Sequence, residues 1–395
     1  MDDLEHWRDE FPILSRSVYM ISNSLGAMPA RAARDLADYA ETWATRGVRA
    51  WEERWWEMPI EIGNKVAWII GAPHGTVSMH ENVTTAHMVA LSAVRPMPSR
   101  RRLVCSALDF PSMVYLFRGL EAAGYELHIV PAEDDLSVSI DRMLAAIDRT
   151  TAVVAFSHVV FRTSFIVDAA AIIQRAHEAG AVAVLDTYQS AGIVPLDVSA
   201  LQVDFAVGGC LKWLCGGPGN AFLYSRPDLL KTVRPAFTGW LSRRAPFSFD
   251  IGADDLRDDA MRMMNGTPCI PAYHAALAGL DIVAEVGLQA IRERSRRFSA
   301  RLLELVDEHG FTTVASRDPE QLAGTVAVSV PAALLVSQTL KARDFLVDYR
   351  PAVGIRISPH FYNTMDEVER IMAEIASIVA KKDYRRGPGG GSLVT

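Results

Sequence analysis

Short runs of Val, Ile, Leu and Ala alternate, from about residue 66, with longer stretches in which apolar residues recur every three or four positions. The short runs have the length and composition of buried strands, and they cover residues 102–106, 127–130, 152–156, 181–185 and 204–207. The longer stretches between them are predicted helices at residues 113–123, 139–147 and 168–179. This alternation predicts an α/β fold in which a mainly parallel sheet lies between layers of helices.

The pattern changes after about residue 275. Long helical periodicity over residues 272–309 is followed by two strand-like runs, 326–330 and 354–358, and by helical stretches at 334–343 and 366–381. A smaller α+β domain is therefore expected at the C-terminal side. The predicted division is an N-terminal segment (1–50) that packs with the small domain, a large domain (51–275), the small domain (276–385) and a flexible Gly-rich tail (386–395).

Polar residues and an aromatic residue follow the ends of predicted parallel strands. Phe110, Ser157 and Asp186 each come just after such an end. Right-handed crossovers place the carboxyl ends of parallel strands, and the ligand-binding loops that follow them, at one edge of the sheet. We therefore expect these side chains to share one site.

Lys212 stands at the start of the Gly-rich turn Trp213-Leu214-Cys215-Gly216-Gly217-Pro218-Gly219. A lysine in this setting, after a buried strand that ends in Asp186, suits a Schiff base with pyridoxal phosphate. The carboxylate of Asp186 would then keep the ring nitrogen of the cofactor protonated. The alternative role for Asp186 is a helix N-cap.

Composition narrows the class of protein. Half of the 395 residues are hydrophobic, and the net charge of -7 argues against nucleic acid or an anionic membrane as the main partner. The charged N-terminus does not resemble a signal peptide, and no apolar run has the length of a membrane span. The four cysteines lack zinc-ligand spacing, and no histidine cluster has the setting of a metal site. A reduced, cytoplasmic enzyme without a metal is expected.

A phosphate group needs backbone N–H groups and hydroxyls, preferably at a helix N-terminus. Val83, Thr84 and Thr85 follow Asn82 and lead into a predicted helix, so they are candidates to bind the cofactor phosphate. The alternative is a plain Thr N-cap. Ser157 is a further candidate for a phosphate or substrate contact.

Six segments, in the expected order, resemble those of fold-type I pyridoxal-phosphate enzymes of the class V aminotransferase group, and of kynureninase in particular. They are Asn23-Ser24-Leu25-Gly26, Asp109-Phe110-Pro111-Ser112, Asp186 with Gln189, Lys212 with its turn, Gly266-Thr267-Pro268, and Asp348-Tyr349-Arg350-Pro351 running into Gly354-Ile355-Arg356. The resemblance implies a large cofactor-binding domain, a smaller C-terminal domain and an amino acid substrate.

The resemblance also implies roles for single residues. Phe110 would stack on the pyridine ring, with Ser112 near it, and Gln189 would donate to the phenolic oxygen of the cofactor. Trp240 and Thr267 correspond to residues that similar enzymes contribute to the phosphate site from a second subunit, which implies a homodimer with shared active sites.

Arg356 is the candidate to bind the substrate's α-carboxylate, because a guanidinium matches a carboxylate bidentately. Asn23 and Ser24 are further candidates for substrate contacts. The alternative for Arg356 is a structural salt bridge, and the same alternative applies to Arg350.

The reaction is left open between two hypotheses. The first is kynureninase-like hydrolysis of a carbon–carbon bond in the side group of kynurenine or a related aryl amino acid. The second is a class V aminotransferase, or a C–S or C–N lyase of a specialised pathway, on the same scaffold. Met113, Gln189, Leu211 and Thr267 depart from the kynureninase pattern, which favours an altered substrate or reaction. A persulfide mechanism is not expected, because no cysteine lies between residues 324 and 356.

Overall fold

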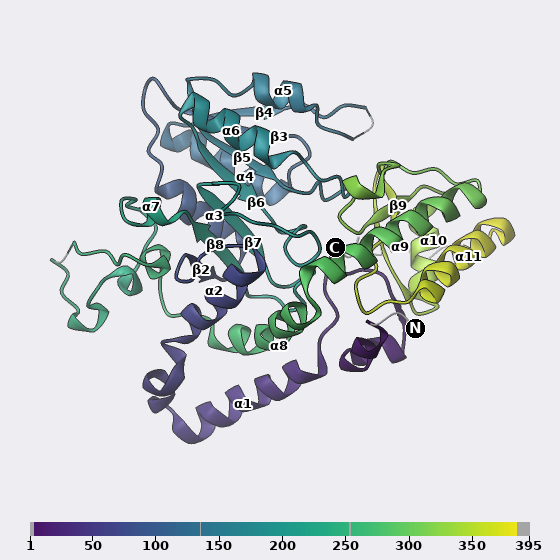
Figure 1. Ribbon diagram of the computed structural model, residues 1–395, viewed down its shortest axis with the longest axis horizontal. Coiled ribbons are helices and arrows are strands. Elements are labelled where there is room, and N and C mark those ends of the chain that lie inside the picture. The colour runs from purple at the N-terminus through teal and green to yellow at the C-terminus, as the bar shows by residue number, and fades with distance from the viewer. Residues whose placement is uncertain (1–3, 135, 253, 385–395) are drawn as a thin grey trace.

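The computed structural model describes residues 4–134, 136–252 and 254–384, and the predicted tail at 386–395 lies outside them. A large lobe and a smaller lobe lie side by side in Figure 1, with the N-terminal segment and helix α1 along their lower side. The large lobe is built on a seven-stranded sheet of order β2-β8-β7-β6-β5-β3-β4. Its strands are β2 (Val77–His80), β3 (Arg102–Ser106), β4 (Glu126–Val130), β5 (Thr151–Ser157), β6 (Val182–Asp186), β7 (Phe205–Gly209) and β8 (Ala221–Ser225).

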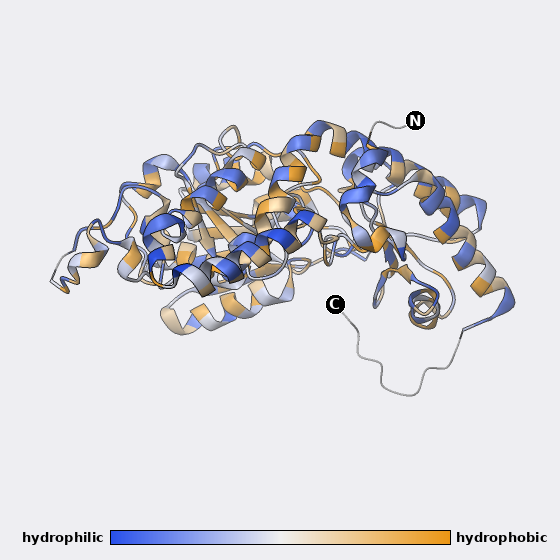
Figure 2. Cartoon of the chain, turned by 90° about the horizontal axis from the view of Figure 1, so that it is seen from below, coloured by the Kyte–Doolittle hydropathy of each residue, from blue (hydrophilic) through white to orange (hydrophobic). Residues whose placement is uncertain are grey.

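The five strands predicted from the sequence, β3 to β7, form the parallel part of this sheet, so the α/β prediction is confirmed. Adjacent strand residues face opposite sides of the sheet. Val104 and Val154 belong to one hydrophobic cluster, whereas their neighbours Leu103 and Val153 belong to another. Figure 2 shows these apolar strands enclosed between helices whose outer sides are hydrophilic.

Different helices cover the two faces. One face packs on helices that supply apolar side chains to the first cluster: α2 (Met58–Ile69), α6 (Ala169–Ala179) and α8 (Ile270–Val286). The other face packs on α3 (Val83–Ser92), α4 (Pro111–Gly119) and the short α7 (Pro227–Leu230). The short α5 (Ile140–Ala145) lies beside α6 on the first face. Helix α4 begins earlier than predicted, because Pro111 occupies its first turn.

Two strands and several helices of the large lobe were not predicted. Strands β2 and β8 pair with each other in the antiparallel sense, and β8 runs antiparallel to β7. Strand β2 contains the polar residues Ser78 and His80, which are buried and hydrogen-bonded to each other at 3.0 Å, so its apolar pattern is interrupted. Helices α1 (Ala30–Arg46) and α2 were also missed.

The small lobe contains a three-stranded antiparallel sheet of order β11-β12-β9. Its elements are α9 (Leu288–Glu308), β9 (Val326–Val328), α10 (Ala333–Lys341), β10 (Phe345–Leu346), β11 (Asp348–Arg350), β12 (Gly354–Ile357) and α11 (Met365–Lys381). The predicted two-helix region 272–309 is thus α8 and α9, which meet at Gly287.

The N-terminal segment and α1 contact both lobes. Strand β1 (Val18–Tyr19) pairs with β10 of the small lobe, whereas Phe11 and Leu14 pack in the hydrophobic cluster of the large lobe. Helix α1, however, packs against α8, whose buried Leu280 and Val283 belong to the large cluster. The change from the large to the small lobe therefore falls near α9, because α8 still completes a face of the large lobe.

Among the described residues, no single helix has the length and apolar composition of a membrane span. The pair α8 and α9 passes that test only when taken together, and it is bent by 82°.

Candidate active site

A cavity of about 380 Å³ lies at the carboxyl ends of the parallel strands. It brings together most of the residues that the sequence singled out, namely Asn23, Ser24, Val83, Thr84, Phe110, Ser112, Ser157, Asp186, Gln189, Lys212 and Arg356. Three other predicted residues, Thr85, Trp240 and Thr267, lie outside this lining. Strand-end position was the signal for Phe110, Ser157 and Asp186, whereas the motif segments supplied Asn23, Ser24, Gln189 and Arg356.

Lys212 lies just beyond the end of β7, in a turn held by close backbone contacts. The Gly26 N–H donates to the Leu211 carbonyl at 2.8 Å. A Cβ atom at Gly26 would lie 2.1 Å from the Lys212 carbonyl oxygen, so only glycine fits there. Burial lowers the pKa of the Lys212 amine to about 7, and the positive charge of Arg356 acts in the same direction. The amine is therefore largely neutral just above neutral pH.

Asp186 ends β6 and is buried. Its Oδ1 accepts a hydrogen bond from the Tyr188 backbone N–H at 2.8 Å. Burial raises the pKa of Asp186 to about 6, while that N–H group and the charge of Lys212 act against the rise. A cation next to this carboxylate would favour its ionised form and would itself be held protonated.

The N-terminus of α3 opens onto the cavity through Asn82, Val83 and Thr84. Asn82 is the N-cap, and its Oδ1 accepts from the Thr85 N–H at 3.0 Å. The N-cap is therefore Asn82 rather than a threonine, and Thr85 is engaged in the cap. The other N–H groups of the first turn have no partner within the helix, as at any helix N-terminus, and can receive an anion.

Aromatic rings stand around the lysine. The Lys212 Nζ lies 4.5 Å from the ring centroid of Tyr188 and 5.8 Å from that of Phe110. Phe110 contacts Phe161 edge to face at 5.3 Å between centroids. Tyr188 and Phe161 line the cavity but were missed by the sequence analysis. Tyr188 lies within the segment from Asp186 to Gln189 and could have been found from that position, whereas Phe161 lies four residues beyond the end of β5.

Arg356 is almost fully buried and pairs with Asp348. Its Nε donates to Asp348 Oδ1 at 2.8 Å, its Nη2 to Oδ2, and its Nη1 to the Phe161 carbonyl. Arg350 also lines the cavity, and its Nη2 lies 3.3 Å from Asp348 Oδ2. The salt bridge considered as an alternative for Arg356 is present, yet each terminal nitrogen of Arg356 retains a second N–H. Two guanidinium groups thus share one carboxylate at the cavity.

Asp109 joins the ends of two strands beneath the cavity. Its Oδ1 accepts from the Ser157 N–H and its Oδ2 from the Ser106 N–H, both at 2.7 Å. Burial raises the pKa of Asp109 to about 6, against the effect of these donors. The side chain of Asp109 therefore positions the Ser157 loop.

The four residues that depart from the kynureninase pattern do not all line the cavity. Gln189 and Leu211 line the cavity. Met113 is instead buried in the hydrophobic cluster that includes residues of α3 and α4, and it is not part of the cavity lining. The change at Met113 affects packing.

Trp240 lies in a separate aromatic group. It contacts Trp56, Phe247 and Phe249, with ring centroids 5.5, 5.5 and 6.2 Å away. Phe247 and Phe249 are exposed, at 56% and 73%. This segment projects from the large lobe at the end remote from the small lobe (Figure 1).

The cavity residues fit pyridoxal phosphate. The Asn23 side chain is 2% exposed and neither its Nδ2 nor its Oδ1 has a hydrogen-bond partner among the described residues. A buried amide without partners is costly and indicates a ligand in the cavity. A reactive amine, a buried carboxylate, a helix N-terminus and flat aromatic walls match the carbonyl, ring nitrogen, phosphate and ring of this cofactor.

The model of the aminotransferase class V family matches residues 18–371. Kynureninase of Pseudomonas fluorescens is 30% identical over 399 residues, which cover 97% of this protein and 94% of that one. An uncharacterized aminotransferase of Bacillus subtilis (strain 168), YcbU, is 28% identical and covers 94% of this protein and 97% of its own length.

Solved structures share the fold. A cysteine desulfurase from Thermococcus onnurineus NA1 superposes with a TM-score of 0.84 at 21% identity, covering 95% of this protein and 98% of that one. The cystine C–S lyase C-DES, in complex with its product cysteine persulfide, gives a TM-score of 0.84 at 20% identity, covering 96% and 100%.

Proposed function

We propose that this protein, which belongs to the aminotransferase class V family and is a pyridoxal-phosphate-dependent enzyme, hydrolyses a carbon–carbon bond in the side group of kynurenine or a related aryl amino acid. The observation that carries the proposal is the single cavity that combines a reactive lysine, a buried carboxylate, aromatic walls and two arginines. The identity to kynureninase over nearly the whole length supports it.

The cofactor would be held by residues from several loops. The first turn of α3, with Val83 and Thr84, would bind its phosphate, with Ser112 and Ser157 nearby. Phe110 would stack on its ring, and Gln189 would donate to its phenolic oxygen. When bound, pyridoxal phosphate withdraws electrons from the substrate's α-carbon, and Asp186 would sustain this by keeping the ring nitrogen protonated.

Lys212 would link the cofactor and then move protons at its Nζ. With a pKa of about 7, caused first by burial, the amine can take up and return a proton near neutral pH. An ordinary surface lysine would be charged under these conditions and could not act as a base.

The substrate would be oriented from its carboxylate end. Arg356, held in place by Asp348, would bind the α-carboxylate, with Arg350 adding positive charge and Asn23 and Ser24 supplying polar contacts. Phe161 and Tyr188 line the same cavity and suit an aryl side group.

The second candidate is a class V aminotransferase, or a C–S or C–N lyase. It is favoured by Gln189 and Leu211, which line the cavity where the kynureninase pattern has other residues, and by the relative YcbU. A persulfide mechanism is disfavoured, because none of the four cysteines lines the cavity and because burial raises the pKa of the Cys210 and Cys215 thiols to about 12. A thiol must ionise to act as a nucleophile.

We also propose that the protein forms a homodimer with shared active sites. The exposed rings of Phe247 and Phe249 beside Trp240 form an apolar surface suited to a second copy of the protein, to whose site Trp240 and Thr267 would contribute. We further propose a cytoplasmic location, which is supported by the unpaired state of all four cysteines.

The test is a visible spectrum followed by product analysis. The purified protein should have a visible-range band that is absent from K212A. Incubation with kynurenine, 3-hydroxykynurenine, cysteine and alanine, read by mass, should give alanine plus an anthranilate from the first two. A 2-oxo acid with pyridoxamine phosphate would favour transamination instead, and a colourless wild-type protein would contradict both candidates.

A further inference from the structure

The amide of Gln189 is held at both of its ends. The indole N–H of Trp213 donates to Gln189 Oε1 at 3.2 Å. Gln189 Nε2 donates to the backbone carbonyl of Asn23 at 3.1 Å. Gln189 lines the cavity, whereas Trp213 lies behind it.

These two contacts leave the amide with one orientation. An indole nitrogen can only donate and a backbone carbonyl can only accept. A flipped Gln189 would set its NH₂ group against the Trp213 N–H and its oxygen against the Asn23 carbonyl, and both hydrogen bonds would be lost. In the observed orientation one N–H of Nε2 remains available to an acceptor in the cavity.

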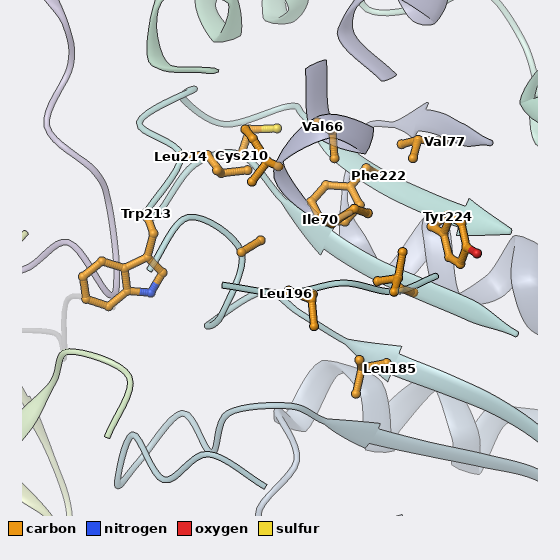
Figure 3. Packing of buried hydrophobic residues seen from close by; sticks show 14 of the residues in the cluster. Val66, Ile70, Val77, Leu185, Leu196, Cys210, Trp213, Leu214, Phe222 and Tyr224 are labelled. Atoms are coloured by element: carbon orange, nitrogen blue, oxygen red, sulfur yellow. The ribbon is translucent and has the colours of Figure 1, made fainter. Parts of the chain in front are cut away.

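Trp213 is itself fixed from the small lobe. It is 1% exposed, and its carbonyl accepts a hydrogen bond from His360 Nε2 at 2.8 Å. The His360 ring packs edge to face on the indole, with centroids 5.3 Å apart. Figure 3 shows the indole of Trp213 extending away from the side chains of Leu214 and Cys210.

We propose that Trp213 is a positioning residue that makes Gln189 present an N–H donor, and not its oxygen, to the phenolic oxygen of the cofactor. This inference rests on the proposed function. When the cofactor is bound, this donor would stabilise the anionic form of its phenolic oxygen. The visible band of the bound cofactor would then titrate at a lower pH, and loss of the donor should raise the titration midpoint.

The experiment is a pH titration of the visible band. In W213F the ring remains but the N–H is lost, and we expect the midpoint to rise by about one pH unit, the size of one charge-assisted hydrogen bond. Q189A should shift the midpoint in the same direction. In the double variant, W213F should add nothing to the shift of Q189A, because its effect passes through Gln189.

The matched control is W55F. Trp55 is also a buried tryptophan, but it packs on Tyr39 and Trp51 and does not line the cavity. Its substitution should leave the titration midpoint unchanged. If W213F does not fold, Trp213 can be replaced by benzothienylalanine, in which sulfur stands in place of the N–H at nearly the same volume.

An unchanged midpoint in either Trp213 variant would overturn the proposal. Equal shifts from W213F with and without Gln189 would do the same, since they would show a purely structural effect. Failure of the proposed function is a different result, because the wild-type protein would then lack the visible band.

Discussion

Asp348 and Arg356 are cross-strand partners in the antiparallel pair β11–β12, and their side chains form an ion pair that is 0% and 2% exposed. Strand register therefore brings the carboxylate directly opposite the guanidinium. Arg350 lies two residues from Asp348 on the same strand and contacts the same carboxylate. Arg350 and Arg356 together carry one positive charge more than Asp348 neutralises, so the small sheet places a net positive charge beside the cavity that contains Lys212.

The first prediction concerns this pair. D348N should lower the free energy of unfolding by about 3 kcal/mol, because it leaves the buried charge of Arg356 without a counter-charge. The urea midpoint of the apoprotein measures the effect. E369Q is the control, since Glu369 pairs with Arg301 at the surface and should change the midpoint little. Equal midpoints for D348N and the wild type would mean that Asp348 does not hold the guanidinium.

The second prediction concerns the amine of Lys212. Its acetylation rate in the apoprotein should rise up to a pH of about 7 and then level off, because only the neutral amine reacts. In the unfolded protein the rate should keep rising toward the ordinary lysine pKa of about 10.5. Mass spectrometry of the Lys212 peptide gives both curves, and coincident curves would refute the lowered pKa.

The surroundings of Lys212 lead to two further expectations about its pKa and about stability. The charge of Asp186 raises the Lys212 pKa, so D186N should move the acetylation midpoint to lower pH. Since the folded pKa lies below the unfolded one, the unfolded protein binds more protons between them. The apoprotein should therefore gain stability from this group as pH rises from about 7 toward 10.5.

The third prediction concerns Asp109. D109A leaves the N–H groups of Ser106 and Ser157 without their acceptor, which should cost about 2–4 kcal/mol of stability. It should also weaken cofactor binding, because Ser157 lines the cavity. Thermal unfolding and cofactor titration measure the two effects. D141A, in the exposed first turn of α5, is the control, and an equally small effect at both positions would contradict the role of Asp109.

The parallel part of the sheet was predictable because most of its strands are apolar runs that are buried on both faces, with the partly exposed edge strand β4 as the exception. Strand β8 escaped prediction because it follows a Gly-rich turn and reverses direction, which no local pattern reports. Lys212 and Asp186 were predictable as site residues because their amine and carboxylate follow buried parallel strands, whose carboxyl ends form the ligand-binding edge of such a sheet.

The partners of the site residues were less accessible to sequence analysis. The Trp213–Gln189 hydrogen bond joins two loops, and its existence depends on how the small lobe seats His360 against the large one. Met113 follows directly after one of the motif segments, yet its side chain is buried in a hydrophobic cluster and not in the cavity lining. A motif indicates where a residue lies along the backbone. The direction of its side chain depends on the three-dimensional fold.

The last prediction separates the two arginines. Substituting Arg356 would break both of its hydrogen bonds to the buried Asp348, whereas Arg350 makes a single contact of 3.3 Å with that carboxylate. Arg350 is therefore the cleaner probe of carboxylate binding. R350Q keeps a polar side group but removes a positive charge beside the cavity, and it should weaken amino acid binding by about 10-fold or more, the size of a charge-assisted hydrogen bond. Binding is read from the change of the visible band on titration with kynurenine. The corresponding amine, which lacks the α-carboxylate, should bind the wild type and R350Q equally, because it offers Arg350 no counter-charge. If R350Q weakened both ligands to the same extent, the arginine would act on the shape of the cavity and not on the carboxylate.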